Sequence, residues 1–307
     1  MTKTLENELN GCGDKREKHP CFCSDARKYV RLHIPIAATC NITCNYCDRR
    51  YDCQNESRPG VTSLVMDQKE AFLKFLSARA MYKNLTVVGV AGPGDALADF
   101  EKTKAVLEMI RHEDSKVEFC LSTNGLLIPR YAMQILALGI RFVTITINAV
   151  DPEIGKYIYK NIQIDGKVLN GKEGAKLLIE NQLEGLRFLA KHNVSCKVNT
   201  VVIKNVNSMH IEDIVKQVRD FGASISNITS LIPVYGTLFS NIPMISSEEL
   251  HKIRIKCSRY IKQMFHCKQC RSDAVGTLTD ERLDESANIG CGGYMIKQNS
   301  EAKCCVI

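Results

Sequence analysis

Segments with the pattern of strands alternate with segments that have the pattern of helices along most of this chain, and this alternation limits the possible folds more than any other feature. The segments predicted as strands are 29–38, 85–90, 117–122, 142–149, 195–203 and 227–233. The predicted helices are 67–82, 100–112, 130–138, 174–192, 211–221 and 247–265, the last beginning with a capping box at Ser246 and Glu249. Strands separated by helices pair in parallel, so the sequence predicts an α/β fold. Periodicity leaves open whether the strands form a doubly wound sheet or a β/α barrel of the TIM type.

Residues that can carry chemistry follow the predicted strands directly. Segment 40–47 follows the first strand, segment 92–95 follows the second, segment 122–125 follows the third, and Asn148 ends the fourth. In both parallel architectures, functional sites lie at the carboxyl ends of the strands. The sequence therefore predicts that these segments meet at one site.

Fifteen cysteines are the unusual part of the composition. Residues 1–18 are polar and contain no apolar stretch that would serve as a secretory signal, so we expect a cytoplasmic protein whose thiols bind metal. No apolar run approaches the ~18 residues that span a bilayer, so we expect no membrane contact. The formal net charge is +7, but the basic residues are scattered and are not interleaved with aromatic ones, which argues against nucleic-acid binding.

Three of the cysteines, Cys40, Cys44 and Cys47, follow the first strand with the spacing Cys-x3-Cys-x2-Cys. Three thiolates on one short loop can hold three irons of a 4Fe–4S cluster and leave the fourth iron open. The amino and carboxylate groups of S-adenosylmethionine can chelate that iron, and an electron from the cluster then yields methionine and a 5′-deoxyadenosyl radical. The alternative is a structural zinc site, which normally has four ligands in paired Cys-x2-Cys units.

The motif, with Tyr46 before its third cysteine, resembles that of the radical S-adenosylmethionine superfamily. The resemblance implies a radical-SAM β/α barrel of the TIM type with cysteine-containing extensions at both ends. We expect boundaries at 1–28 for the N-terminal extension, 29–265 for the barrel and 266–307 for the C-terminal extension. The resemblance also implies that the backbone of segment 92–95 binds the methionine amino group, although Gly-Pro-Gly suits a plain turn as well.

Further residues near this end of the sheet are candidate contacts to S-adenosylmethionine. In the fourth strand, Thr144, Thr146 and Asn148 alternate with apolar residues, which places them on one face, either the barrel lumen or an exposed sheet face. Segment 122–125 suits ligand contacts or an ordinary turn, and Ile203 suits a contact to adenine or a place in the core. The candidate contacts are Tyr46, Gly92, Gly94, Asp95, Ser122, Asn124, Thr146, Asn148 and Ile203.

Other potential metal ligands lie in segments that a barrel would bring to one mouth: His19, Cys21, Cys53, Cys120, Cys267 and Cys270. Five thiols and one imidazole suffice for two further 4Fe–4S clusters with three protein ligands each. The Cys267-x2-Cys270 pair also suits half a zinc knuckle, and His19 also suits an ordinary loop histidine. Cys196 and Cys257 lie in a predicted strand and a predicted helix and are interpreted as core residues.

A narrower resemblance, to the NifB family of nitrogenase-cofactor maturases, covers about residues 19–282. The segments that carry it are 19–21, 40–60, 91–95, 120–125 and 267–276, and the run from Cys47 to Gly60 is the most specific. The resemblance implies that two 4Fe–4S substrates, the K clusters, fuse into an 8Fe–9S core around a carbide. It implies that the methyl group of one S-adenosylmethionine provides the carbon, that a second molecule provides the radical, and that an extra sulfur is added.

The same resemblance implies three partners: an iron–sulfur cluster donor, a carrier or scaffold protein of cofactor assembly, and an electron donor. Glu56 and Arg58, beside Cys53, either orient a cluster or form a solvated charge pair. Many relatives carry a C-terminal cofactor-binding domain, and we expect a short form without it. Cysteines outside the family pattern are Cys12, Cys23, Cys291, Cys304 and Cys305. Two alternatives remain: a radical enzyme that modifies a peptide or small molecule with auxiliary clusters, and a zinc-stabilised binding module.

Overall fold

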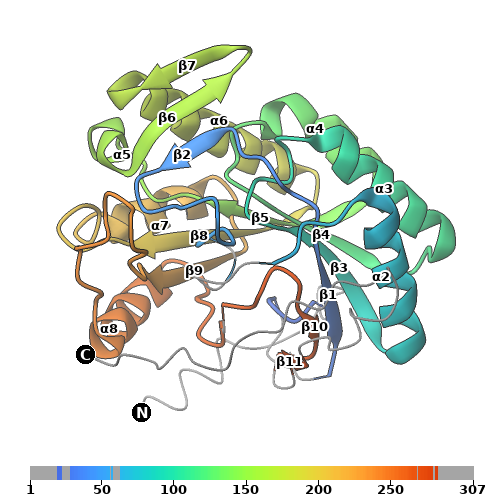
Figure 1. Cartoon of the computed structure of the whole chain (residues 1–307). Coiled ribbons are helices and arrows are strands. Elements are labelled where there is room, and N and C mark those ends of the chain that lie inside the picture. Colours follow the sequence, from blue (N-terminus) through green and yellow to red (C-terminus); the bar gives the residue numbers. More distant parts are fainter. Residues whose placement is uncertain are drawn as a thin grey trace, which may run out of the picture.

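Six strands form one curved parallel sheet in the computed structural model (Figure 1). The structure describes residues 19–22, 28–55, 57, 63–267, 269–278 and 281–282. In chain order the strands are β1 (Val30–Pro35), β3 (Leu85–Ala91), β4 (Glu118–Thr123), β5 (Ile140–Thr146), β8 (Ser195–Val202) and β9 (Ile225–Ser230). The helices between them are α2 (Gln68–Met81), α3 (Phe100–Glu113), α4 (Ile128–Ala137), α5 (Pro152–Ile158), α6 (Gly171–Lys191) and α7 (Ile211–Asp220).

The order of the strands distinguishes the two architectures that the sequence left open. A doubly wound sheet reverses its strand order, whereas a barrel adds every new strand on the same side. The order β1-β3-β4-β5-β8-β9 never reverses, and each neighbouring pair is parallel. The fold is therefore a partial β/α barrel, which confirms the predicted fold class.

The barrel is open between β9 and β1. Within the described ranges, β1 pairs on its outer edge with the short antiparallel strand β10 (Val275–Gly276), which pairs with β11 (Glu281–Arg282). At the other edge, Met264 donates its N–H to the Ser226 carbonyl of β9. The chain between Met264 and β10, which contains Cys267 and Cys270, therefore runs from one edge of the opening to the other. We call residues 263–276 the bridging segment.

Most predicted elements are found with ends shifted by a few residues, but the last predicted helix is much shorter than expected. Helix α8 (Ser247–Ser258) begins with the predicted capping box at Ser246 and Glu249 and does not reach residue 265. Beyond α8, Lys262 accepts a hydrogen bond from the Ser226 N–H, and Gln263 forms a parallel bridge with Ser226. Residues 262 and 263 thus pair with the free edge of β9 instead of continuing the helix.

A second sheet of three strands was missed by the sequence analysis. It contains β2 (Ile42–Cys44), β6 (Tyr159–Ile164) and β7 (Lys167–Asn170), all antiparallel. The β6–β7 turn consists of Asp165 and Gly166, with φ of 51° and 73°. Because β2 lies inside the cysteine motif, this sheet fixes the cysteine loop to the barrel (Figure 1).

The predicted alternation in β5 is confirmed, and its polar face is the inner face of the sheet. Thr144 pairs in register with Lys197, and Thr146 pairs with Asn199, which in turn pairs with Asn227. Paired residues of neighbouring strands point to the same side. Lys197, Asn199 and Asn227 all line a central cavity, so this face is the lumen of the partial barrel.

The hydrophobic core lies on the opposite face of the sheet, under the helices. Leu32 and Val88 of the sheet and Phe75 and Leu107 of the helices have no exposed surface. Full burial of such a side chain contributes about 1.5–3 kcal/mol, so this layer can hold the strands while the inner face stays polar. None of the described helices combines the length and apolar character needed to cross a bilayer.

Candidate functional site

The three cysteines of the Cys-x3-Cys-x2-Cys motif line one pocket, the cluster pocket, at the carboxyl end of β1. Cys44 ends β2, and the Cys47 N–H donates to the Cys44 carbonyl over 3.1 Å. The Arg49 guanidinium donates to the carbonyls of Ile42 at 2.8 Å and Cys40 at 3.2 Å. Pairing of β2 with β6 and these side-chain bonds hold the loop in one conformation.

The loop after β3 lies directly against the chain that precedes Cys40. The Gly94 N–H donates to the Ala37 carbonyl over 2.8 Å, and the Asp95 N–H donates to the Thr39 carbonyl over 2.6 Å. A Cβ on Gly94 would lie 2.0 Å from the Thr39 oxygen, so only glycine permits this approach. The carbonyls of Pro93 and Gly94 accept no hydrogen bond from the described residues. Pro93 and Gly94 both line the cluster pocket, so their backbone suits an ammonium group, such as the amino group of S-adenosylmethionine.

Asp95 and Asn124 form the adjoining wall of the cluster pocket. The buried Asp95 carboxylate accepts hydrogen bonds from the Thr123 hydroxyl, at 2.9 and 3.0 Å, and from the Asn124 N–H. The Asn124 amide donates to the Asn41 side chain over 2.6 Å and lies 3.5 Å from Cys40 Sγ. The Asp95 side chain thus joins the loops after β3 and β4, while the Asn124 amide reaches the cysteine motif.

The thiols of the cluster pocket require a metal to ionise. Burial raises the pKa of Cys40 to about 12, and the Asp95 carboxylate adds to this shift. Burial also raises the pKa of Cys44 and of Cys47. Iron must therefore displace protons that the thiols would otherwise keep at neutral pH.

The donor set of the cluster pocket suits a 4Fe–4S cluster. The three thiols of the motif line one pocket on one short loop. A 4Fe–4S cluster can take one thiolate on each of three irons and leave the fourth iron open. The residues present therefore fit the group that the motif predicts.

The remaining predicted contacts do not line the cluster pocket. The Tyr46 hydroxyl donates to the Asn55 side chain and accepts from the Asn148 amide, both over 2.6 Å. The Thr146 hydroxyl is buried and has no hydrogen-bond partner within the described ranges. Ile203 is fully buried in the hydrophobic core, which favours its interpretation as a core residue. The predicted contacts that line neither the cluster pocket nor the central cavity are Tyr46, Gly92, Ser122, Thr146, Asn148 and Ile203.

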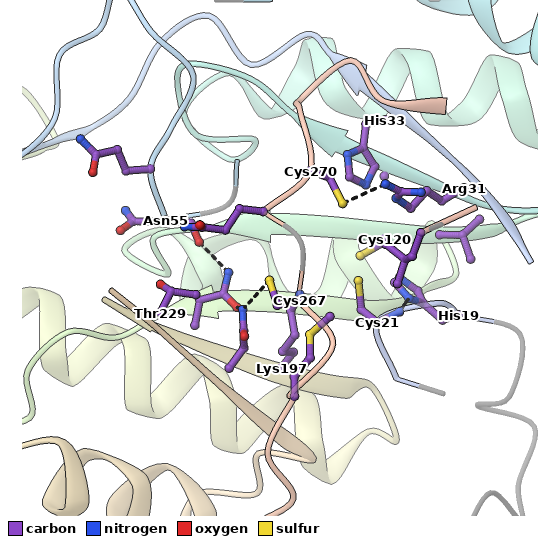
Figure 2. Close-up of a pocket in the computed structure, with 18 residues that line it drawn as sticks. His19, Cys21, Arg31, His33, Asn55, Cys120, Lys197, Thr229, Cys267 and Cys270 are labelled. Atoms are coloured by element: carbon purple, nitrogen blue, oxygen red, sulfur yellow. Dashed lines mark hydrogen bonds between the residues drawn. The ribbon is translucent and has the colours of Figure 1, made fainter. Parts of the chain in front are cut away.

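The central cavity on the inner face of the sheet brings together five of the six further predicted ligands (Figure 2). The ligands come from three separate parts of the chain: residues 19–22, strand β4 and the bridging segment. These five residues are His19, Cys21, Cys120, Cys267 and Cys270.

The sixth predicted ligand, Cys53, lines the cluster pocket instead. Two residues further on, Asn55 lines both the cluster pocket and the central cavity. The Asn55 carbonyl accepts a hydrogen bond from the Asn199 side-chain amide at 2.6 Å. The Asn227 side-chain amide donates to the Asn199 side-chain oxygen at 3.0 Å and to Cys267 Sγ at 3.4 Å (Figure 2). Segment 53–55 therefore forms the wall between the two sites. Lying outside the described residues are Cys12, Cys23, Glu56, Arg58, Cys291, Cys304 and Cys305.

His19 is neutral in this environment, as a metal-binding imidazole must be. Burial lowers the pKa of His19 well below its ordinary value, and the Lys197 charge lowers it further. Its Nδ1 accepts the Cys21 N–H over 3.1 Å, and its buried Nε2 has no partner in the described part of the chain. Binding iron through Nε2 would therefore require the ring proton to move to Nδ1 and this short-range hydrogen bond to break.

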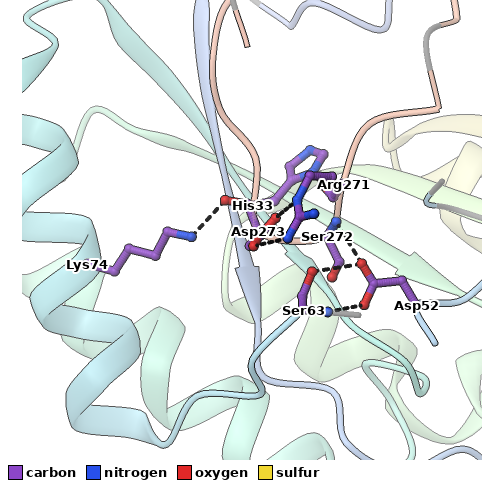
Figure 3. Close-up of polar contacts among 7 residues, drawn as sticks. All are labelled: His33, Asp52, Ser63, Lys74, Arg271, Ser272 and Asp273. Carbon is purple, nitrogen blue, oxygen red and sulfur yellow. Dashed lines mark hydrogen bonds and ion pairs between the residues drawn. The ribbon is translucent and has the colours of Figure 1, made fainter. Parts of the chain in front are cut away.

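A polar network fixes the bridging segment against the barrel (Figure 3). The buried Asp52 carboxylate accepts from the Ser63 N–H at 3.1 Å, the Ser63 hydroxyl at 2.7 Å and the Ser272 N–H at 3.3 Å. On the other side, Lys74 of α2 donates to the Asp273 carbonyl over 2.7 Å. Asp52 directly precedes Cys53, and Ser272 lies two residues after Cys270. The network therefore positions predicted ligands from two distant parts of the chain.

Replacing Asp52 with alanine should lower the free energy of unfolding by about 2–4 kcal/mol, because it leaves buried donors of Ser63 and Ser272 without acceptors. Denaturant unfolding of the metal-free protein measures this loss. The control is Asp48→Ala in the same loop, since Asp48 forms an exposed ion pair with Arg50 that should contribute less than about 1 kcal/mol. Equal unfolding free energies for the two variants would contradict the anchoring role of Asp52.

Residues 34–218 match the family described as the Radical SAM superfamily. The matched region covers more than half of the chain and includes the cysteine motif and both adjoining loops. The chain belongs to the radical SAM superfamily. Membership in this superfamily implies an enzyme that uses a 4Fe–4S cluster and S-adenosylmethionine, and the geometry of the cluster pocket fits both.

Within the radical SAM superfamily, the chain is similar to FeMo cofactor biosynthesis proteins NifB. It is 42% identical to NifB of Bradyrhizobium diazoefficiens over 280 residues, which cover 90% of this chain and 56% of the relative. It is 40% identical to NifB of Chlorobaculum tepidum over 270 residues, which cover 88% of this chain and 64% of the relative. The resemblance to NifB predicted from the sequence is confirmed, and the chain spans 56–64% of the length of these relatives.

Two solved structures share the fold of this chain. Streptococcus suis SuiB bound to S-adenosylmethionine aligns with a TM-score of 0.55 and 14% identity, covering 77% of this chain and 50% of SuiB. The FeFe-hydrogenase maturase HydG from Carboxydothermus hydrogenoformans aligns with a TM-score of 0.55 and 15% identity, covering 77% of this chain and 53% of HydG. At such low identity, these similarities concern the fold alone.

Proposed function

We propose that this radical SAM enzyme is a maturase of the nitrogenase cofactor, which fuses two 4Fe–4S substrate clusters into an 8Fe–9S core around a carbide derived from S-adenosylmethionine. The observation that carries the proposal is the central cavity, where predicted ligands from three distant segments meet beside the cluster pocket. The similarity to NifB supports the same function. A peptide-modifying radical enzyme would give no role to His19 and Cys21 at this position.

Each site has its own residues in the proposed reaction. Cys40, Cys44 and Cys47 would hold the resident cluster, which when bound would supply the electron that cleaves S-adenosylmethionine. The backbone carbonyls of Pro93 and Gly94, which line the same pocket, would accept hydrogen bonds from the amino group of S-adenosylmethionine. Asp95 keeps the two supporting loops together, and Asn124 restrains Cys40.

The substrate clusters occupy the central cavity, so the enzyme handles three clusters in all. Cys120 and the two cysteines of the bridging segment bind them from the barrel side, while His19 and Cys21 bind them from the N-terminal side. Cys53 faces the cluster pocket, where it can contact a substrate cluster at the boundary between the sites. We also infer three protein partners: a cluster donor, a carrier or scaffold that receives the product, and an electron donor.

S-adenosylmethionine labelled with ¹³C in its methyl group should yield two coproducts, 5′-deoxyadenosine and S-adenosylhomocysteine, and should leave label in cluster-bound carbon. The reason is that carbide formation needs both a methyl transfer and hydrogen abstraction from the transferred methyl. Chromatography of the coproducts and analysis of the carbon retained by the protein measure both steps.

The variant Cys120→Ala should lose label from the cluster fraction and still release 5′-deoxyadenosine, because Cys120 lies in the central cavity and not in the cluster pocket. Its matched control is Cys196→Ala, which removes a buried core thiol from β8 and should retain both reactions. Recovery of label only in methionine, with no S-adenosylhomocysteine, would rule out carbide insertion and favour the peptide-modifying alternative.

A further inference from the structure

Lys197 projects into the central cavity from β8, and nothing in the sequence pattern singled it out (Figure 2). Only 8% of its surface is exposed. The described side chains that line the cavity with it include no Asp or Glu, so no carboxylate of the lining balances its charge. Burying a charged group without a partner is strongly unfavourable, so this position makes physical sense where an anion binds.

Lys197 shares the cavity with the four cysteines predicted to bind substrate clusters. Cys21, Cys120, Cys267 and Cys270 all line the same space as its side chain. An ammonium group in this place lies among the sulfur atoms that the proposed substrate clusters would use.

Arg31 provides a second buried cation on the opposite side of these thiols (Figure 2). Its guanidinium donates to Cys270 Sγ and to the Gly276 carbonyl, both at 2.8 Å. Among the described residues that line the cavity, Lys197 and Arg31 are the lysine and arginine side chains.

We propose that Lys197, together with Arg31, compensates the negative charge of iron–sulfur clusters in the central cavity and retains clusters that have only three protein ligands. The inference rests on the proposed function and deepens it. In such a cluster, the negative charge lies on the sulfides and thiolates at its surface, where a nearby cation can stabilise it. With too few thiolates to close the cluster, sulfides at its open faces need hydrogen-bond donors, which an ammonium and a guanidinium provide. An ionic contact also lets the product leave, since no iron–protein bond has to break at these positions.

The test uses full-length protein in which Cys40, Cys44 and Cys47 are all replaced by alanine, so that retained iron belongs to the central cavity. After anaerobic reconstitution, iron, acid-labile sulfide and the rate of iron loss to a chelator are measured. Lys197→Met should lose iron at least about tenfold faster than the same background with Lys197, because a buried charge partner is removed. Lys197→Arg should stay within about twofold of that background, since it keeps the charge. Lys160→Met, which removes one exposed lysine of the hairpin, should change nothing.

Thermal unfolding separates this role from a merely structural one. Without metal, Lys197→Met should unfold at a higher temperature than the background with Lys197, because an unpaired buried charge has been removed. With clusters bound, the order should reverse. If the methionine variant does not fold, Lys197→Gln serves the same purpose.

The possible failures can be told apart. Equal iron retention in Lys197→Met and the background with Lys197 would overturn the charge-compensation role and leave the proposed function standing. Absence of iron from the central cavity of the background itself would overturn the proposed function, and this inference with it.

Discussion

Replacing Cys44 with alanine is expected to abolish the cleavage of S-adenosylmethionine while most of the protein's iron remains bound. Cys44 lies in β2 and lines the cluster pocket with Cys40 and Cys47, so its loss leaves two thiolates for the resident cluster. The ligands of the central cavity lie in other segments, and Asn55 lies in the wall between the two sites. If three clusters bind, about four of about twelve irons should be lost.

Release of 5′-deoxyadenosine under reducing conditions and iron content by mass spectrometry are the two measurements. Cys257→Ala is the matched control, because Cys257 is a buried thiol on α8 that lines neither site. It should retain cleavage and iron. Normal release of 5′-deoxyadenosine by Cys44→Ala would mean that the cysteine motif is not the radical site.

The barrel could be predicted because its signals are local and repeated. Strand β3 is apolar over most of its length and is followed by α3, a helix long enough to show its period. The polar face of β5 was visible as an alternation of Thr144 and Thr146 with apolar residues. Strand order could not be derived in this way, because it depends on pairing between segments that are distant in sequence.

The three-stranded sheet was missed for the opposite reason. Strand β2 has only three residues and interrupts the cysteine motif, and β7 is mostly exposed, so neither shows a clear hydrophobic period. One signal was present, since Asp165-Gly166 is a dipeptide that favours a two-residue hairpin turn. The dipeptide does not indicate that β6 pairs with β2, so it could not show that the hairpin supports the cysteine loop.

The sequence predicted the metal-binding residues of the central cavity but not its buried basic residues, and the difference has a physical cause. Cysteines and histidine are rare residues with known metal chemistry, so their convergence on the central cavity could be expected once the fold was assumed. Lys197 and Arg31 are ordinary basic residues, and only the register of β8 and β1 shows that they are buried and face inward. Cys53 was grouped by chemistry with the cavity ligands, but segment 53–55 places it in the cluster pocket.

The second large effect is expected at Gly94, which binds no metal. Here the two loops that form the cluster pocket are in backbone contact, through the Gly94–Ala37 and Asp95–Thr39 hydrogen bonds. A Cβ on Gly94 would lie 2.0 Å from the carbonyl oxygen, 2.5 Å from the carbonyl carbon and 2.7 Å from the nitrogen of Thr39. All three are backbone atoms, so the collision cannot be relieved by a side-chain rotation. The chain must move at Thr39, the residue before Cys40.

Gly94→Ala should therefore displace Cys40 and reduce cleavage of S-adenosylmethionine by ~100-fold or more, as expected for a shift of about 1 Å in a reacting group. Iron in the central cavity should be retained, because its predicted ligands line a different cavity from Gly94. The control is Gly166→Ala at the tip of the β6–β7 hairpin, where φ is +73° but no atom lies within 4 Å of the new Cβ. That variant bears backbone strain without a collision and should keep most of its activity. Comparable loss of 5′-deoxyadenosine formation in both variants would mean that strain in any glycine turn, and not the contact with Thr39, controls the cluster pocket.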